Sequence, residues 1–298
     1  MEHPRSVLVT GASTGIGKAI ALALHARGFV VFAGVRRESD GVVLRREAGD
    51  RLKPVLLDVT SQDSIARAVA AISEQTGGEL YGLVNNAGVG LGGPLEIVPI
   101  EETRKLMEVN VIGLLAVTQA FLPLLRKGQG RIVNIGSLAG IVAMPGGSSY
   151  AASKFAVQAI TDSLRLELAP VGVQVSIVDP GAIESALWDK GRTQKAAILD
   201  AAPPHLLELY APLIELGKQL GDNPRDILPA ACVADDVLLA LTARKPKPRY
   251  LVGPGPKRAA RLARMPVRLR EWLIGKFLES GVERDAGQAS EAGEQGVS

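Results

Sequence analysis

The sequence predicts an α/β fold built on a doubly wound, parallel, seven-stranded sheet with helices on both faces. Short runs rich in Val, Leu and Ile alternate with longer segments of helical period. Each short run is apolar throughout, as expected for parallel strands that are buried on both faces. A chain of 298 residues with 47% hydrophobic residues can bury one large core, but it is short for two independent domains.

Each predicted strand is an apolar run bounded by turn residues or charged residues. The seven runs are Ser6–Thr10, Phe29–Ala33, Pro54–Leu57, Gly82–Asn85, Arg131–Ile135, Val173–Val178 and Tyr250–Val252. The segments between them are long enough for helical crossovers, which parallel strands require. Helical period is clearest at Ile16–Arg27, Ser61–Gln75, Glu101–Leu125, Ser148–Ala169 and Ala234–Ala243.

Residues 186–230 interrupt this rhythm, and we expect them to form a helical lid inserted into one α/β domain that spans residues 1–253. Five prolines surround a short apolar helix predicted over Leu206–Leu220. The lid also supplies apolar side chains that could face a ligand: Leu187, Trp188, Leu206, Leu207, Leu209, Tyr210, Leu213 and Ile214. The same helix could instead use its apolar side to pack on the body.

Residues 254–283 form a basic amphipathic extension, which Pro266 is expected to split into two helices. Lys257, Arg261, Arg264 and Arg268 recur at helical spacing, while Leu262, Leu269, Trp272, Leu273 and Phe277 occupy other positions. Two interpretations stay open for residues 257–279: weak peripheral contact with an anionic membrane, or packing against the body or another subunit. Residues 284–298 are rich in Gly, Glu, Ser and Gln, which predicts disorder.

Charge and composition exclude several classes of function. The net charge is +3, but residues 244–276 hold 11 Lys and Arg against one acid, so the body is net negative. Nucleic-acid binding is therefore not expected. The single Cys232, the absence of an apolar leader and the strand-sized apolar runs predict a cytoplasmic protein without a membrane span. The three histidines do not cluster, so no metal site is predicted.

The segment from Thr10 to Gly17 predicts a dinucleotide site. It is a turn with three glycines that follows the first strand and opens a helix. Glycines let the backbone approach a pyrophosphate, whose charge is held by free N–H groups and the helix dipole. The sheet is therefore of the Rossmann type.

A second signal comes from Tyr150 and Lys154, which lie four residues apart on one face of a helix. Ser137 follows the fifth strand, so it stands at the carboxyl edge of the sheet, where doubly wound folds bind ligands. The ammonium group of Lys154 would favour the phenolate of Tyr150, as an acid/base at neutral pH requires. Ser137 would bond a substrate oxygen as charge develops on it.

These motifs resemble the short-chain dehydrogenase/reductase family, in its single-domain branch, over residues 5–253. The matching positions are the TGxxxGxG loop at Thr10–Gly17, NNAG at Asn85–Gly88, Asn110, Ser137, Tyr150 with Lys154, and PG at Pro180–Gly181. The resemblance implies that Asn110, Ser137, Tyr150 and Lys154 are catalytic, with Asn110 holding a water that passes protons. The coenzyme residues it implies are Gly11, Ser13, Thr14, Gly15, Ile16, Gly17, Arg36, Asp58, Val59, Asn86, Ala87, Gly88, Tyr150, Lys154, Pro180, Gly181, Ile183 and Ser185. Ser185 departs from the family's usual threonine.

The function implied is NAD(P)-dependent interconversion of an alcohol with a ketone or aldehyde, by a homodimer or homotetramer. NADP(H) is the preferred coenzyme and NAD(H) the alternative, because Val35 and Arg36 stand where NAD enzymes carry an acid. The lid favours an apolar or amphipathic substrate of steroid, retinoid or acyl-chain type. A non-catalytic dinucleotide sensor on the same fold is the competing class. An epimerase or dehydratase would usually have a longer carboxyl-terminal substrate domain.

Overall fold

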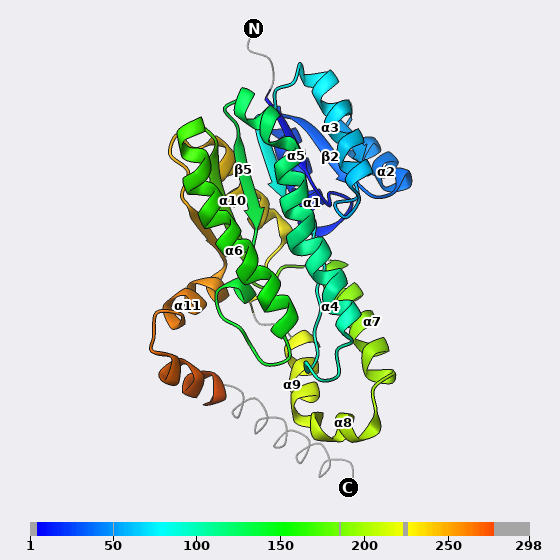
Figure 1. Cartoon of the computed structure of the whole chain (residues 1–298), viewed down its shortest axis with the longest axis vertical. Helices are drawn as coiled ribbons and strands as arrows, with labels where there is room; N and C mark the ends of the chain where they lie inside the picture. The colour runs from blue at the N-terminus through cyan, green and yellow to red at the C-terminus, as the bar shows by residue number, and fades with distance from the viewer. Residues whose placement is uncertain (1–4, 50, 185, 223–225, 277–298) are drawn as a thin grey trace, which may run out of the picture.

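The computed structural model describes residues 5–49, 51–184, 186–222 and 226–276, and it confirms the doubly wound sheet (Figure 1). All strand pairs are parallel, in the order β3-β2-β1-β4-β5-β6-β7. The strand order reverses between β1 and β4, which is where such sheets open a ligand crevice at their carboxyl ends. The strands are β1 Ser6–Val9, β2 Val30–Val35, β3 Leu52–Leu56, β4 Gly82–Asn85, β5 Arg131–Ile135, β6 Gln174–Pro180 and β7 Arg249–Val252.

Two helical layers cover the sheet because each helix buries one apolar stripe against it. On one face, α1 (Gly15–Ala26) and α10 (Ala230–Thr242) pack together and bury Leu24 and Val237. On the other face lie α3 (Gln62–Thr76), α5 (Gly113–Lys127) and α6 (Ser148–Leu168). Phe121 is fully buried there, and burial of a side chain of this size is worth about 1.5–3 kcal/mol.

The helix predicted over Glu101–Leu125 is divided. It begins as α4 (Ile100–Met107), passes through a π-helical turn at Glu108–Ile112 and continues as α5. By length and composition the whole run Ile100–Lys127 could cross a membrane, but half of its most apolar window is buried inside the protein. Its α5 part packs on the sheet, with Val117, Phe121 and Leu125 buried in the core. A further helix, α2 (Glu38–Ala48), was not predicted, because it is polar and leaves Val42 and Val43 exposed.

The lid consists of three helices, and the single helix predicted over Leu206–Leu220 is wrong. The helices are α7 (Ala186–Asp200), α8 (Pro204–Leu209) and α9 (Ala211–Asp222), which extend beyond the body beside α4 (Figure 1). The break falls at Tyr210, before Pro212 in the first turn of α9, where a proline is tolerated. Short 3-10 turns at Leu138–Gly140 and Ala169–Val171 complete the described elements.

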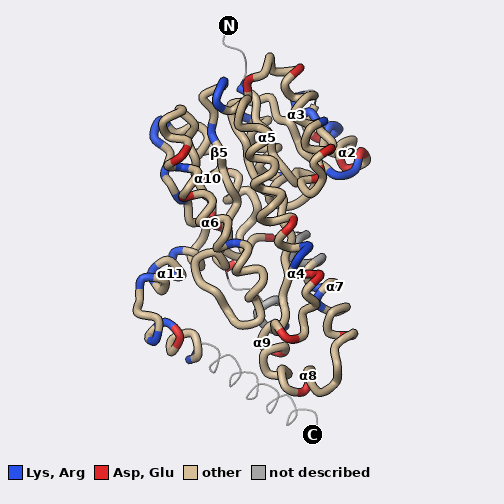
Figure 2. Tube along the Cα trace, viewed as in Figure 1, with Lys and Arg blue, Asp and Glu red and all other residues tan. Residues whose placement is uncertain are grey.

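The chain leaves β7 through Gly253 into a carboxyl-terminal arm, residues 254–276. The arm contains α11 (Pro254–Leu262) and a second helical stretch, residues 267–276, with the break that was predicted around Pro266. Its Lys and Arg residues lie along α11 and the stretch that follows (Figure 2). Phe277 and the tail predicted to be disordered, 284–298, lie outside the described residues.

Candidate active site

A cavity of about 610 Å³ opens at the carboxyl ends of the strands, beside the reversal between β1 and β4. Most predicted site residues line it, although they come from seven separate stretches of chain. On its wall are Gly11, Ser13, Thr14, Gly15, Ile16, Gly17, Arg36, Asp58, Val59, Asn86, Ala87, Gly88, Ser137, Tyr150, Lys154, Pro180, Gly181 and Ile183. Ser185 lies outside the described residues.

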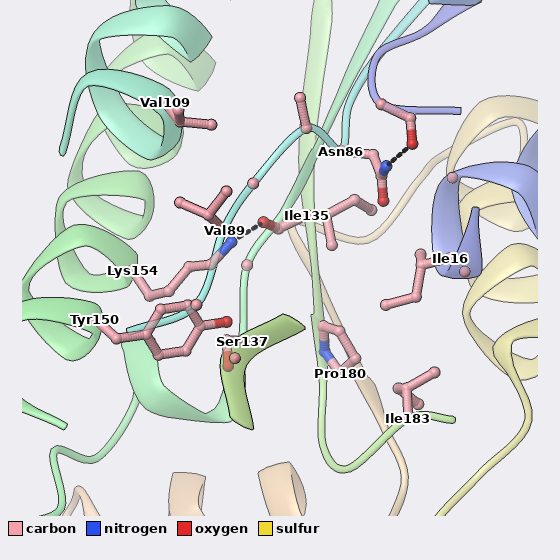
Figure 3. A pocket seen from close by; sticks show the side chains of 18 of the residues that line it. Ile16, Asn86, Val89, Val109, Ile135, Ser137, Tyr150, Lys154, Pro180 and Ile183 are labelled. Atoms are coloured by element: carbon pink, nitrogen blue, oxygen red, sulfur yellow. Dashed lines mark hydrogen bonds between the residues drawn. The ribbon is translucent and has the colours of Figure 1, made fainter. Parts of the chain in front are cut away.

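The glycine loop owes its shape to close approaches that only glycine permits. Gly11 has a φ of 63°, a left-handed conformation that L side chains rarely adopt. A Cβ on Gly17 would overlap the carbonyl oxygen of Gly11 and the amide of Asn86. Asn86 donates from Nδ2 to the carbonyl oxygens of Thr10 (2.9 Å) and Gly11 (3.1 Å), as the close view shows for one of these bonds (Figure 3). The loop after β1 is thus fastened to the end of β4.

Arg36 and Asp58 stand at the adenosine end expected for a dinucleotide. Arg36 is exposed, lines the cavity and has no ion-pair partner among the described residues, whereas the neighbouring Arg37 pairs with Asp40. The carboxylate of Asp58 accepts hydrogen bonds from the backbone N–H (3.0 Å) and the hydroxyl (2.7 Å) of Thr60. One Asp58 oxygen accepts both bonds, which leaves the other oxygen available to a ligand.

Tyr150, Lys154 and Ser137 meet at the centre of the cavity. The hydroxyl groups of Tyr150 and Ser137 point toward the same space (Figure 3). Lys154 is buried and donates from Nζ to the carbonyl oxygen of Ile135 at 3.0 Å, which ties α6 to the end of β5. Ser137 Oγ accepts a hydrogen bond from the backbone N–H of Ala139 at 3.1 Å. The hydroxyl proton of Ser137 therefore remains available to donate to a ligand oxygen.

Asn110 does not line the cavity, although it was predicted beside the other catalytic residues. It sits in the π-helical turn, is buried, and exchanges two hydrogen bonds with the backbone of Val89: N–H to Oδ1 (2.8 Å) and Nδ2 to the carbonyl oxygen (3.0 Å). Its Nδ2 also donates to Ser153 Oγ at 3.1 Å. Asn110 therefore fixes the loop after β4 against α6 from behind the wall.

Asp179 is a buried acid next to the site that sequence reasoning missed. It is fully buried at the end of β6, where its Oδ1 accepts from the backbone N–H of Ser137 (3.1 Å) and from Gln158 Nε2 (2.6 Å). Burial raises the pKa of Asp179 to about 6, against the lowering effects of Arg249, Gln158, Ser137 and Lys154. The only hint in the sequence is an acid between an apolar strand and Pro180, which does not distinguish a buried carboxylate from a strand end.

The substrate half of the cavity is apolar, and of the two interpretations left open for the lid side chains the structure supports packing on the body. Apolar lining comes from Val89, Leu138, Val142 and Met144. The predicted lid residues Leu206, Leu207, Tyr210 and Ile214 instead pack against the body in a cluster with Leu91, Ile97 and Leu106. The described lid residues that reach the cavity are Gly191 and Gln194, both from α7, and Gln194 Nε2 donates to Glu102 on α4. The side chains of Leu187 and Trp188 are outside the description.

Comparisons with known proteins agree with this geometry. The family model for the short chain dehydrogenase matches residues 5–196. The 17-beta-hydroxysteroid dehydrogenase type 6 of Bos taurus is 39% identical over 260 residues, covering 83% of this chain and 80% of its own. The NADPH-dependent 3-dehydrocapnine reductase of Ornithobacterium rhinotracheale is 37% identical over 256 residues, covering 84% and 88%. A crystal structure of a short-chain dehydrogenase from Streptomyces avermitilis is 31% identical, covers 100% of both chains and has a TM-score of 0.73.

The chain belongs to the short-chain dehydrogenase/reductase family. It is an oxidoreductase that acts on CH–OH groups with NAD(P), so the sensor alternative is set aside.

Proposed function

We propose that this enzyme interconverts a secondary or primary alcohol with its ketone or aldehyde on an apolar or amphipathic substrate, using NADP(H) in preference to NAD(H). The observation that carries the substrate class is the apolar wall formed by Val89, Leu138, Val142 and Met144 beside the hydroxyl groups of Tyr150 and Ser137. Pockets of this kind bind a ligand mainly by burying its apolar surface, while a few polar groups orient it. The relative named as a hydroxysteroid dehydrogenase supports the same class.

The proposed catalytic roles follow from the geometry. In the direction of reduction, the hydroxyl groups of Ser137 and Tyr150 both donate to the substrate carbonyl oxygen. A bound nicotinamide coenzyme would supply the hydride that reduces the carbonyl carbon. Tyr150 gives its proton to the carbonyl oxygen, which completes the alcohol. Lys154, buried and positively charged beside Tyr150, stabilises the phenolate that remains. In the direction of oxidation the same proton returns to Tyr150.

The proposed coenzyme preference rests on Arg36. Its guanidinium is unpaired among the described residues and borders the cavity next to Val35, where no acid could repel a 2′-phosphate. A guanidinium binds a phosphate through two charge-assisted hydrogen bonds. The relative named as an NADPH-dependent reductase supports this assignment.

One assay tests class, substrate and coenzyme together. A panel of ketones, aldehydes and alcohols, ranging from short polar compounds to steroids, retinoids and long acyl-chain alcohols, is followed by nicotinamide absorbance with each coenzyme. We expect kcat/KM to rise with the apolar area of the substrate. Equal turnover of short polar and large apolar substrates would contradict the substrate class.

We also propose that the carboxyl-terminal arm makes weak peripheral contact with an anionic lipid surface. Trp272 is 59% exposed and Val267 54% exposed, so neither is packed within the described chain. Leu262 and Ile274 pack instead on Ile141 and Val142, which holds the arm against the body. Exposed apolar side chains among arginines suit anionic lipid, whereas a second copy of the arm would bring like charges together.

A further inference from the structure

Asp179 lies behind the hydroxyl groups of Tyr150 and Ser137, and its carboxylate accepts a hydrogen bond from the backbone N–H of Ser137. It is the last residue before Pro180 in β6, while Ser137 follows β5, the neighbouring strand. The backbone of Gly136 lies so close to the carboxylate of Asp179 that a Cβ on Gly136 would overlap Asp179 Oδ1. The Gly136–Ser137 backbone and the Asp179 carboxylate therefore form a single packed unit.

Charged and polar groups from two elements, β7 and α6, surround this carboxylate. Arg249 on β7 places Nε 3.5 Å from Oδ2, while Lys154 on α6 acts on it at longer range. Gln158, also on α6, donates to Oδ1 and accepts from Arg249 through its own oxygen. These groups orient a buried ion that would otherwise be strongly unfavourable.

The two carboxylate oxygens of Asp179 have different partners. Oδ1 accepts both hydrogen bonds, from Ser137 N–H and from Gln158. Oδ2 is buried without a hydrogen-bond partner in the described chain and lies 3.5 Å from Arg249 Nε. A hydrogen bond to an ionised oxygen is stronger than one to a neutral oxygen, so the hold on Ser137 depends on the charge of Asp179.

We propose that Asp179 is a positioning residue for catalysis: its ionised carboxylate, oriented by Arg249 and Gln158, holds the Ser137 backbone so that the Ser137 hydroxyl meets the substrate oxygen. The inference rests on the proposed role of Ser137. Ser137 has an extended backbone, with φ −173° and ψ 158°, and its Oγ is already engaged by Ala139 N–H. Loosening the Ser137 N–H bond would shift the donor that the substrate oxygen needs, and small displacements of this kind reduce rates strongly.

A pH dependence follows. Oδ1 already accepts hydrogen bonds from two donors, so a proton binds at Oδ2. Protonation removes the attraction between Asp179 and Arg249, and it leaves Oδ1 as the weaker acceptor of a neutral carboxyl group. Burial raises the pKa of Asp179 to about 6, so the hold on Ser137 weakens as the pH falls through that value. The Asp179→Asn variant keeps Oδ1 and removes the charge, so it should resemble the wild type at low pH.

The test compares pH profiles of kcat and of KM for the full chain between pH 5 and 8, with coenzyme binding measured separately by fluorescence. For Asp179→Asn we expect kcat at pH 8 to fall about tenfold, with the acid limb near pH 6 lost and coenzyme affinity unchanged. Arg249→Gln keeps the carboxylate but removes its main counter-charge, so its acid limb should move to higher pH. Lys245→Gln removes an exposed charge elsewhere and should leave the profile unchanged.

The outcomes separate the inference from the function on which it rests. A wild-type rate and profile in Asp179→Asn, or an unmoved limb in Arg249→Gln, overturns the inference. If the Asp179→Asn protein does not fold, the shift of the acid limb in Arg249→Gln decides whether the inference holds. Ser137→Ala reports on the proposed function: retained activity there would reject the role of Ser137 itself, whereas its loss together with an unaffected Asp179→Asn rejects only the positioning role.

Discussion

Lys154 Nζ donates a hydrogen bond of 3.0 Å to the carbonyl oxygen of Ile135, two residues before Ser137. This bond joins the helix that carries Tyr150 to the strand end that carries Ser137. The relative placement of the two hydroxyl groups is therefore set by a buried side chain that also carries the positive charge beside Tyr150. One residue serves both the geometry and the electrostatics of the site.

Tyr150→Phe should reduce kcat at least about 100-fold, because it removes the proposed proton donor and leaves the ring in place. Thermal unfolding and coenzyme binding should be unchanged. Tyr81→Phe is the matched control: it removes a hydroxyl that donates to the Leu241 carbonyl oxygen, away from the cavity, and should retain activity. A Tyr150→Phe enzyme with more than a tenth of wild-type turnover would remove Tyr150 from the mechanism.

Arg36→Gln should lower kcat/KM for NADP(H) by about tenfold or more and leave the value for NAD(H) nearly unchanged, because in the proposed binding mode the guanidinium contacts only the 2′-phosphate. Arg37→Gln makes the same chemical change one residue further on, at a side chain already paired with Asp40. It should affect neither coenzyme. Steady-state kinetics with both coenzymes provide the measurement, and a tenfold advantage of NAD(H) in the wild type would contradict the assignment.

Asp179→Asn should leave the free energy of unfolding at pH 7 equal to the wild-type value or higher. The folded state raises the pKa of Asp179 from 3.8 to about 6, so the folded protein binds this proton more tightly than the unfolded chain. Between these pH values unfolding releases a proton, and the stability contribution falls as the pH rises, by up to about 3 kcal/mol. Asparagine removes that penalty.

Urea unfolding of both proteins at pH 4.5 and pH 7.5 measures the difference. The stability gain from asparagine should be larger at pH 7.5, where the wild-type carboxylate is ionised. A variant that is less stable than the wild type at pH 7.5 would show that the ion pair with Arg249 outweighs the burial of the charge.

The double variant Trp272→Ser, Leu269→Ser should lose binding to phosphatidylserine-containing vesicles that the wild type shows at low salt. Both side chains are exposed, so the fold and activity should be unaffected. Val42→Ser, Val43→Ser removes two exposed apolar side chains on α2 and serves as the control. Cosedimentation at low and high salt measures binding. Absence of wild-type binding would reject the lipid proposal, and a change in oligomer mass in the double variant would favour a subunit interface.

The sequence predicted the sheet well because its strands are buried on both faces and therefore read as unbroken apolar runs. The site residues could be predicted for a related reason. They lie where strands end, and local motifs such as Thr10–Gly17 mark those ends. The lid was harder. Its break at Tyr210 and the packing of Ile214 onto Leu106 depend on contacts between distant segments, which a helical period does not contain.

Two features of the site depend on three-dimensional context in the same way. Asp179 reads as an ordinary strand end until β7 brings Arg249 beside it. Asn110 was predicted from the family resemblance, but its contacts with Val89 were not, because no local pattern in the sequence marks a π-helical turn. The structure was needed to show that Asn110 lies behind the wall of the cavity.

That π-helical turn, Glu108–Ile112, has a consequence for the engineering of this enzyme. A π turn interrupts the regular hydrogen bonding of the otherwise continuous helix from Ile100 to Lys127. Deleting one residue here would make the helix more regular while turning Asn110 away from Val89. Attempts to raise heat tolerance by regularising this helix should therefore select stable proteins with impaired catalysis.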